Sequence, residues 1–173
     1  MPFIPRGTLN PHGAPVLRSH ILANSATFTV FDSVRANTSG FIGLGTAGAS
    51  VLGHIVALRT NQGVGLLTTG AAGAEIGSFI NTFTTASNNQ TVARVRAEID
   101  VSKSSLYAGE LSAAIGTTTG SNLLGYYLDL TDEDTLNEGS AATTAAQYFN
   151  HGVDTVDSTS CLVNVFESQV FGV

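Results

Sequence analysis

Strict alternation of apolar and charged residues at positions 92–101 constrains the fold more than any other feature of the chain. Val95, Ala97 and Ile99 alternate with two arginines and then with two carboxylates. A period of two is that of a β-strand with one buried face and one polar face. Opposite charges on the polar face can pair across neighbouring strands. The segment therefore predicts a strand of an antiparallel sheet, and we interpret its carboxylates as surface groups in preference to a catalytic set.

Much of the remaining sequence predicts further short strands, separated by turns rich in glycine and asparagine. Strands are predicted at residues 26–34, 51–59, 63–67, 76–84, 125–130 and 161–167. Short helices are predicted at residues 104–116, where Gly109 is unfavourable, and at residues 141–149. The expected fold is mainly β: a compact β-barrel or β-sandwich-like module of short antiparallel strands with one or two short helices.

A glycine-rich segment, Gly43 to Gly48, matches the G-x-G-x-x-G pattern of dinucleotide-binding loops. Such a loop needs a preceding strand, a following helix and an acidic residue about 20 positions later. Little strand sequence precedes Gly43, and no acidic residue occurs between the loop and Glu75. The segment therefore indicates a turn between strands, and no cofactor is predicted. A small nucleotide-binding enzyme that uses Gly43–Gly48 remains an alternative.

The N-terminal residues 1–25 are predicted to form an extended arm, followed by one β-rich domain at residues 26–173. All four prolines lie within the first fifteen residues, where they disfavour a helix or a central strand. Apolar residues in the arm favour its lying along a partner. The candidate partner-binding residues are Phe3, Ile4, Val16, Leu17, Ile21 and Leu22.

Composition excludes several classes of function. Only 12% of the residues are charged, and 7 basic against 13 acidic residues give a net charge of −6. A protein that tracks nucleic-acid phosphates needs clustered Lys and Arg, so no direct nucleic-acid contact is expected. No apolar run approaches the roughly 20 residues of a spanning helix, and the N-terminus lacks the order of a signal peptide. No membrane association is predicted.

No arrangement of side chains predicts catalysis or metal binding. His54 lies among apolar residues and is expected to be a buried, hydrogen-bonded strand residue. Cys161 is the only cysteine and is expected to be a buried, inert thiol. Four carboxylates in residues 132–138 raise the alternative of a Ca²⁺ site, but their spacing is not that of an EF-hand loop. A solvated acidic loop is favoured.

The order of short strands with glycine turns in residues 48–86, followed by residues 92–101, resembles the capsid decoration (cement, or head-stabilising) proteins of tailed bacteriophages. Residues 125–154 and 161–172 are similar to the C-terminal parts of predicted phage structural proteins. The likeness covers most of residues 41–171. The family has no catalytic residues to transfer to this chain.

The resemblance implies a virion structural protein that binds the outside of a capsid and bridges neighbouring capsid subunits. Its partners would be the major capsid protein and further copies of itself, with a trimer favoured, and its arm would add a strand to a capsid protein. It would be made in the host cytoplasm and reside on the capsid exterior. This chain is longer than the smallest members, so residues 102–157 are expected to be an insertion or an outer face.

A β-sandwich module that binds carbohydrate or a host surface, as a head appendage, is the alternative from another class. Carbohydrate sites favour exposed aromatic residues. The chain has no tryptophan. The tyrosines available for such a site are Tyr107, Tyr126, Tyr127 and Tyr148.

Overall fold

The computed structural model describes residues 3–10, 13–67, 79–112, 124–125, 127–137, 147–154 and 160–166. Its strands are β1 (Ile4–Thr8), β2 (Leu17–Ile21), β3 (Thr27–Thr29), β4 (Ser33–Ala36), β5 (Ile42–Leu44), β6 (Gly53–Arg59), β7 (Thr82–Thr84), β8 (Arg96–Asp100), β9 (Ser105–Leu111), β10 (Tyr127–Asp132), β11 (Thr135–Asn137), β12 (Tyr148–Val153) and β13 (Ser160–Val165). A five-residue π-helix, η1 (Asn89–Ala93), precedes β8. The prediction of a mainly β fold with a compact barrel is confirmed.

Five strands in the order β2-β8-β6-β4-β5 form the first sheet, which we call barrel I. A bridge between Leu22 and Ile42, with a hydrogen bond of 2.7 Å from the Ala23 N–H to the Ile42 carbonyl, joins the end of β2 to β5 and closes the ring. The β3–β7 ribbon contributes the buried Phe28. The apolar core of barrel I consists of Leu22, Phe28, Val34, Ile42, Ile55, Leu58, Val95, Ala97 and Ile99.

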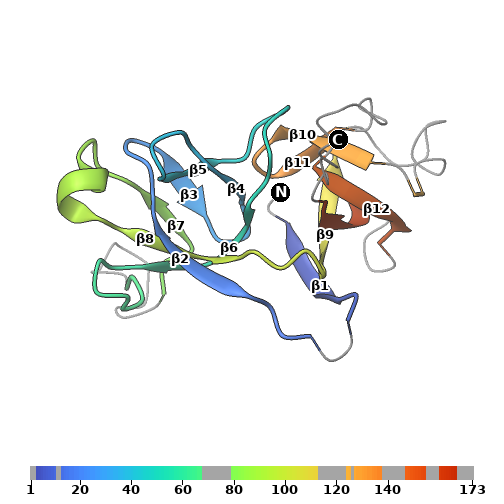
Figure 1. Cartoon of the computed structure of the whole chain (residues 1–173), viewed down its shortest axis with the longest axis horizontal. Coiled ribbons are helices and arrows are strands. Elements are labelled where there is room, and N and C mark those ends of the chain that lie inside the picture. The colour runs from blue at the N-terminus through green and yellow to red at the C-terminus, as the bar shows by residue number, and fades with distance from the viewer. Residues whose placement is uncertain are drawn as a thin grey trace, which may run out of the picture.

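The second sheet, which we call barrel II, has the order β1-β9-β11-β10-β12-β13, and a further pairing of β13 with β9 closes it. Figure 1 shows the two barrels side by side, with β2, β6 and β8 in one half and β9 to β12 in the other. The core of barrel II consists of Phe3, Val51, Tyr107, Leu111, Leu128, Leu130, Leu136, Tyr148, Cys161, Val163 and Val165. Residues 102–157, expected to be an insertion or outer face, thus supply most of a second core.

The N-terminal segment is extended, as expected, but it is part of both barrels. β1 pairs with β9 of barrel II, and β2 pairs with β8 of barrel I. The division between an arm at residues 1–25 and a body at residues 26–173 is therefore not seen in the strand pairing. Phe3 is fully buried in barrel II, where its ring stacks on Tyr148 with the ring centroids 5.1 Å apart.

The prediction of a helix at residues 104–116 is wrong for the described residues, which form β9 up to Leu111. A side chain at Gly109 would place its Cβ 2.4 Å from the Phe3 ring, so glycine is needed where the N-terminal segment crosses β9. The predicted strand at residues 63–67 makes only isolated bridges, at Gly65 and Leu67. The predicted helix at residues 141–149 lies largely outside the described residues, and its last two residues belong to β12.

Candidate functional site

The glycine-rich loop joins the two barrels. The Gly48 N–H donates to both oxygens of Asp129 in β10, over 3.2 and 3.0 Å. Gln147 Nε2, just before β12, donates to the carbonyls of Thr46, at 3.0 Å, and Ala49. A cofactor-binding loop would need free amide donors and a helix behind them. Here the chain continues into β6, so the loop serves as a link between barrels.

His54 on β6 of barrel I packs its ring against Phe3, Tyr107 and Tyr148 in the core of barrel II. Its Nε2 lies 3.2 Å from the Tyr148 hydroxyl and its Nδ1 lies 3.3 Å from the Phe31 carbonyl. Its ring centroid lies 4.0 Å from that of Tyr107. Burial lowers the pKa of His54 to about 4. The neutral ring donates to the carbonyl and accepts from the hydroxyl, which confirms the prediction of a buried, satisfied histidine.

A second contact between the barrels places carboxylates close together. The Ser33 N–H and hydroxyl both donate to the Glu133 carbonyl, at 2.9 and 2.7 Å. Asp32 is buried beside them and accepts from the Thr29 N–H at 2.7 Å. Burial is the main cause that raises the pKa of Asp32 to about 7, and the charges of Glu133 and Asp134 add to it. The junction therefore holds two titratable groups with opposite shifts.

Asp100, at the end of β8, is buried although alternation placed it on the polar face of its strand. Its carboxylate accepts from the Tyr107 hydroxyl at 2.8 Å and from the Ser102 N–H at 2.9 Å. The polar face of β8 becomes an interior surface at this end because barrel II covers it. The expectation of a surface carboxylate is wrong here, because residues that follow β8 in the chain, among them Ser102 and Tyr107, fold back onto this end of the strand.

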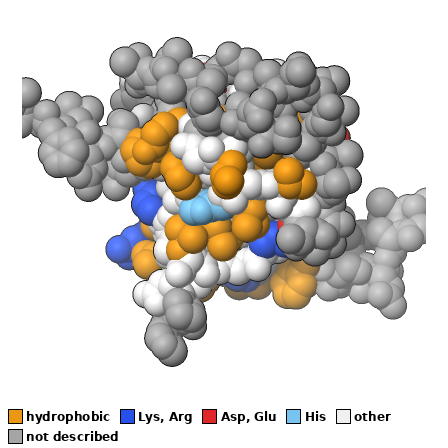
Figure 2. Space-filling view, turned by 90° about the vertical axis from the view of Figure 1, so that its right-hand side faces the viewer, with side chains coloured by type: hydrophobic (Ala, Val, Ile, Leu, Met, Phe, Trp, Pro, Cys, Tyr) orange, Lys and Arg blue, Asp and Glu red, His pale blue; other side chains and the backbone are white. Residues whose placement is uncertain are grey.

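An aromatic row lies on the outer face of barrel II. Tyr127 packs between Phe166 and Phe149, with ring centroids 4.4 and 5.4 Å away, and His151 follows 4.9 Å beyond Phe149. All four side chains are half-buried, and His151 Nε2 lies 2.7 Å from Asn164 Oδ1. Figure 2 shows a histidine among hydrophobic side chains on the side of the molecule where β12 lies. We call Tyr127, Phe149, His151 and Phe166 the aromatic face.

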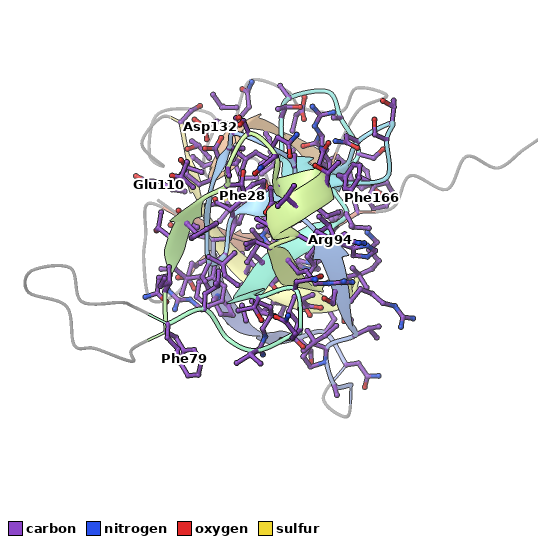
Figure 3. The ribbon with its side chains drawn as sticks, turned by 90° about the vertical axis from the view of Figure 1, so that its left-hand side faces the viewer. Phe28, Phe79, Arg94, Glu110, Asp132 and Phe166 are labelled. Atoms are coloured by element: carbon purple, nitrogen blue, oxygen red, sulfur yellow. The ribbon has the colours of Figure 1, made fainter. Side chains whose placement is uncertain are left out.

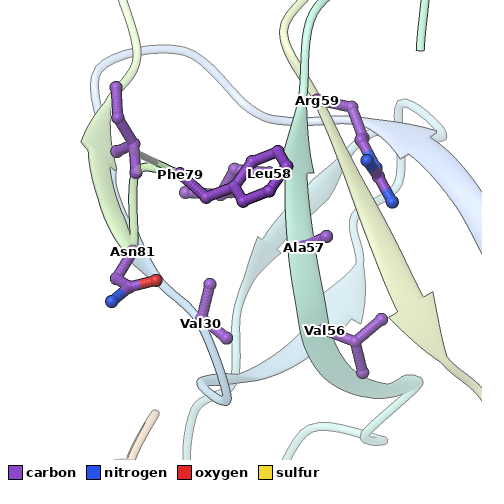
Figure 4. A pocket seen from close by; sticks show the side chains of 8 residues that line it. Val30, Val56, Ala57, Leu58, Arg59, Phe79 and Asn81 are labelled. Atoms are coloured by element: carbon purple, nitrogen blue, oxygen red, sulfur yellow. The ribbon is translucent and has the colours of Figure 1, made fainter. Parts of the chain in front are cut away.

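A shallow apolar hollow lies beside β6 in barrel I. A bulge between Ile55 and Ala57 interrupts the pairing with β8, and Val56 lines the hollow. Figure 4 shows Val30, Leu58 and Phe79 around the opening. Phe79 is 71% exposed and projects from the edge of the barrel in Figure 3, whereas Phe28 is buried. Exposed apolar side chains of this kind mark surfaces available for contact.

The structure distributes the six predicted partner-binding residues over different environments. Phe3 and Leu22 are core residues of the two barrels, which corrects the expectation that they contact a partner. Ile4 and Ile21 are half-buried in β1 and β2. Val16 and Leu17 are 47% and 41% exposed. Of the six, these two present the most apolar surface to a partner.

The aromatic face was missed at the level of sequence for a specific reason. Alternation in residues 161–167 correctly placed Phe166 opposite the buried Cys161 and Val163. Phe149 fell in a predicted helix, so its position beside Phe166 could not be inferred. Of the four tyrosines considered for carbohydrate binding, Tyr107 and Tyr148 are buried, Tyr127 lies on the aromatic face, and Tyr126 lies outside the described residues.

The remaining candidates for chemistry are placed as follows. Cys161 is fully buried, which confirms the prediction of a buried thiol, and burial raises the pKa of that thiol to about 11. Asp132 and Asp134 flank the β10–β11 turn. Within the described ranges, no group of three His, Cys, Asp or Glu side chains is arranged to hold a metal ion.

Comparison of the chain with protein-family models, with curated proteins and with solved structures finds no match in any of the three. Among the residues that the structure describes, no helix has the length and apolar character needed to cross a membrane.

Proposed function

We propose that this chain is a virion structural protein that binds the outside of a bacteriophage capsid and stabilises the shell by bridging neighbouring capsid subunits. The observation that carries the proposal is the aromatic face, a half-exposed set of large side chains on a folded β surface. Apolar surface of this kind favours protein contact. The resemblance of residues 41–171 to capsid decoration proteins supplies the class of partner.

The proposed mechanism is mechanical. Many copies bury apolar surface against neighbouring capsid subunits, and the shell becomes harder to open because several weak contacts act together. The junction between the barrels makes each copy one rigid spacer, since His54, Gly48 and Ser33 all bond across it. Because β1 and β2 are paired within the chain, the capsid contact is made by folded surface and not by a free arm.

Co-sedimentation with expanded, undecorated capsids of the cognate phage tests this function. The wild-type chain is expected to sediment with the capsids, and Phe149→Ser is expected to weaken binding about tenfold or more, as truncated aromatic contacts at interfaces do. Val92→Ser is the control, because it removes an apolar side chain that is 68% exposed and lies in η1, outside both the aromatic face and the apolar hollow. Absence of wild-type co-sedimentation, or equal binding by both variants, would contradict the proposal.

Homo-oligomerisation, with a trimer favoured, is part of the same proposal. Light scattering on the purified chain measures its mass directly. A monomer at micromolar concentration that also stays monomeric on the capsid would rule this part out.

A second candidate function is a carbohydrate- or host-binding module, and the same aromatic face favours it. Aromatic rings beside hydrogen-bonding groups such as His151 and Asn164 are typical of small-ligand sites. Binding to a panel of immobilised glycans distinguishes the two functions. Saturable glycan binding that Phe149→Ser abolishes, without any capsid co-sedimentation, would favour this alternative.

A further inference from the structure

A buried carboxylate without a cationic partner lies at the junction of the barrels. Asp100 is 5% exposed, and the groups that donate hydrogen bonds to it, among them the Tyr107 hydroxyl and the Ser102 N–H, are neutral. In the described part of the chain, no Lys, Arg or His side chain forms an ion pair with it. Burial alone would raise the pKa of Asp100, but hydrogen bonding lowers it overall, so the group stays ionised. Hydrogen bonds from neutral donors offset the cost of burying this charge, and no positive charge among the described residues is paired with it.

Ser105, at the start of β9, provides a second unusual group beside Asp100. Its side chain is buried, with the residue 4% exposed, and its hydroxyl forms no hydrogen bond of ordinary geometry. The hydroxyl is nevertheless close enough to Asp100 to help lower the pKa of that carboxyl. Buried hydroxyl groups are nearly always satisfied, so an unsatisfied one calls for a ligand or a water.

Both groups line one cavity of about 310 Å³ between the N-terminal segment and the two barrels. This volume is at the small end of the range for ligand cavities, roughly 300–1,000 Å³. Its polar lining includes Asp100, Ser105 and Tyr107. Its apolar walls are formed by Pro5, Pro15, Phe31, Val56 and Leu106.

We propose that this cavity binds a primary ammonium group carried on an aliphatic stem, with Asp100 and Ser105 as its acceptors. An ammonium has three N–H donors. The two carboxylate oxygens of Asp100 and the Ser105 hydroxyl oxygen supply three acceptors. The apolar walls match the methylene groups of the stem. The ammonium supplies the counter-charge that the protein itself does not.

Other ligand classes fit these groups less well. A planar guanidinium presents a fixed fork of donors, whereas the acceptors here come from two different strands. A neutral alcohol leaves the buried charge unpaired, and an anion is repelled by Asp100 and by the net charge of −6. The inference is independent of the proposed function, because it rests on this cavity alone.

Titration of the full chain with n-butylammonium chloride, followed by amide chemical shifts, tests the inference. n-Butanol is the neutral isostere, and sodium chloride at the same ionic strength controls for salt. Saturable binding of n-butylammonium is expected, with n-butanol at least about tenfold weaker because the charge-assisted hydrogen bonds are lost. Equal binding of the alcohol and the amine, or no saturable binding of the amine, would overturn the inference.

Two variants locate the binding. Asp100→Asn is expected to raise the Kd for n-butylammonium about tenfold or more. Asp132→Asn makes the same charge change at an exposed residue and is expected to leave the Kd unchanged. Ser105→Ala removes the third acceptor of the proposed site, so it is expected to weaken amine binding several-fold. A folded Asp100→Asn or Ser105→Ala variant with an unchanged Kd for n-butylammonium would contradict the assignment of the ammonium site to these residues.

The ammonium group has two possible sources, a small free amine or a lysine side chain of another protein. Titration with N-acetyl-lysine N-methylamide distinguishes them, because its backbone must stay outside the cavity. Binding as tight as that of n-butylammonium indicates a lysine side chain, and binding of n-butylammonium alone indicates a free amine. If neither compound binds, the cavity is not an ammonium site.

Discussion

The two barrels have rings of five strands each but differ in how the chain builds them. Every core residue of barrel I lies between Leu22 and Ile99, within one continuous stretch. Barrel II takes its ring from residues 105–165, yet its core also contains Phe3, from the N-terminal segment, and Val51, from the segment just before β6. Barrel I is thus complete by itself, whereas barrel II depends on contacts that are distant in sequence.

This difference assigns a role to the N-terminal segment. Its prolines and apolar residues suit an extended chain, and in the structure that chain pairs first with barrel II and then with barrel I. Arg6 adds an ion pair of 2.8 Å to Asp154 at the end of β12. The segment therefore extends the sheet of the second barrel and fills part of its core, and removing its contacts should affect the two barrels unequally.

Phe3→Ala is expected to have the largest effect. Loss of a fully buried aromatic ring costs about 3–5 kcal/mol of unfolding free energy. Amide hydrogen exchange should show the loss of protection mainly in β9, β12 and β13. Phe28→Ala, a ring equally buried in barrel I, should cost a similar amount and act mainly on β6 and β8. Equal loss of protection in both barrels for both variants would show that they open as one unit.

The pH dependence of stability should report on the junction. His54 has a folded pKa of about 4 against an ordinary 6.5, so its contribution is lost as pH falls through that window, by about 3 kcal/mol. Asp32 has a folded pKa of about 7 against 3.8, so its contribution is lost as pH rises through that window. Between about pH 4 and 6.5 the two slopes oppose each other, and urea unfolding should give a nearly constant free energy.

Asp32→Asn separates the two contributions. The variant should no longer lose stability near pH 7, and its unfolding free energy should rise between pH 4.5 and 6.5 because only His54 then titrates there. Asp100 and Lys103 are the other charged groups that act on His54, and Glu133 and Asp134 act on Asp32. An Asp32→Asn profile that parallels the wild-type profile would contradict this assignment.

Two glycine positions compare how the barrels tolerate extra volume. In barrel II, Gly109→Ala places a Cβ against the side chains of Phe3 and Leu136 and is expected to cost about 1–3 kcal/mol. In barrel I, Gly53→Ala places a Cβ 2.0 Å from the Asp100 carbonyl oxygen, which cannot rotate away, so it should cost more. Phe3→Leu is expected to restore part of the stability of Gly109→Ala and none of that of Gly53→Ala. If Phe3→Leu raised the melting temperatures of Gly109→Ala and Gly53→Ala equally, the contact between residue 109 and Phe3 would not be the cause of the loss.

The alternation of apolar and polar residues was sufficient to predict a strand, and its buried face, where one face of the strand packs against a core. Residues 95–99 and 161–165 alternate cleanly, and the structure buries Val95, Ala97, Ile99, Cys161 and Val163. Burial of these side chains follows from a period of two, which the sequence displays directly.

Contacts between segments that are distant in sequence cannot be predicted from such local patterns. The helix at residues 104–116 was predicted from a serine at its start and Gly116 at its end, whereas β9 is a strand that pairs with β1, β11 and β13 and is crossed by Phe3 at Gly109. Asp100 was predicted to face solvent for the same reason, because nothing near it in the sequence indicates that Tyr107 and Ser105 cover it. The cavity and the aromatic face both arise from segments brought together by the second ring.

Two ion pairs, one in each barrel, provide the comparison with the smallest expected effect on stability. Arg6 donates from Nε and Nη2 to Asp154 in barrel II, at 3.1 and 2.8 Å, and Arg59 donates in the same manner to Glu98 in barrel I, at 3.2 and 2.6 Å. The geometries match, but the Asp154 side chain is 4% exposed and that of Glu98 is 28% exposed. Burial is thus the variable that differs.

Arg59→Met should therefore cost under about 1 kcal/mol, and the cost should vanish in 1 M salt because exposed pairs are screened. Arg6→Met should cost more and keep most of its cost in salt, since it leaves a buried carboxylate without its guanidinium. It should also lower hydrogen-exchange protection in β1 and β12, as Phe3→Ala does. Equal, salt-sensitive costs in the two barrels would mean that Arg6 does not help to hold β1 against barrel II, and that the pairing of β1 with β9 and the packing of Phe3 hold it there.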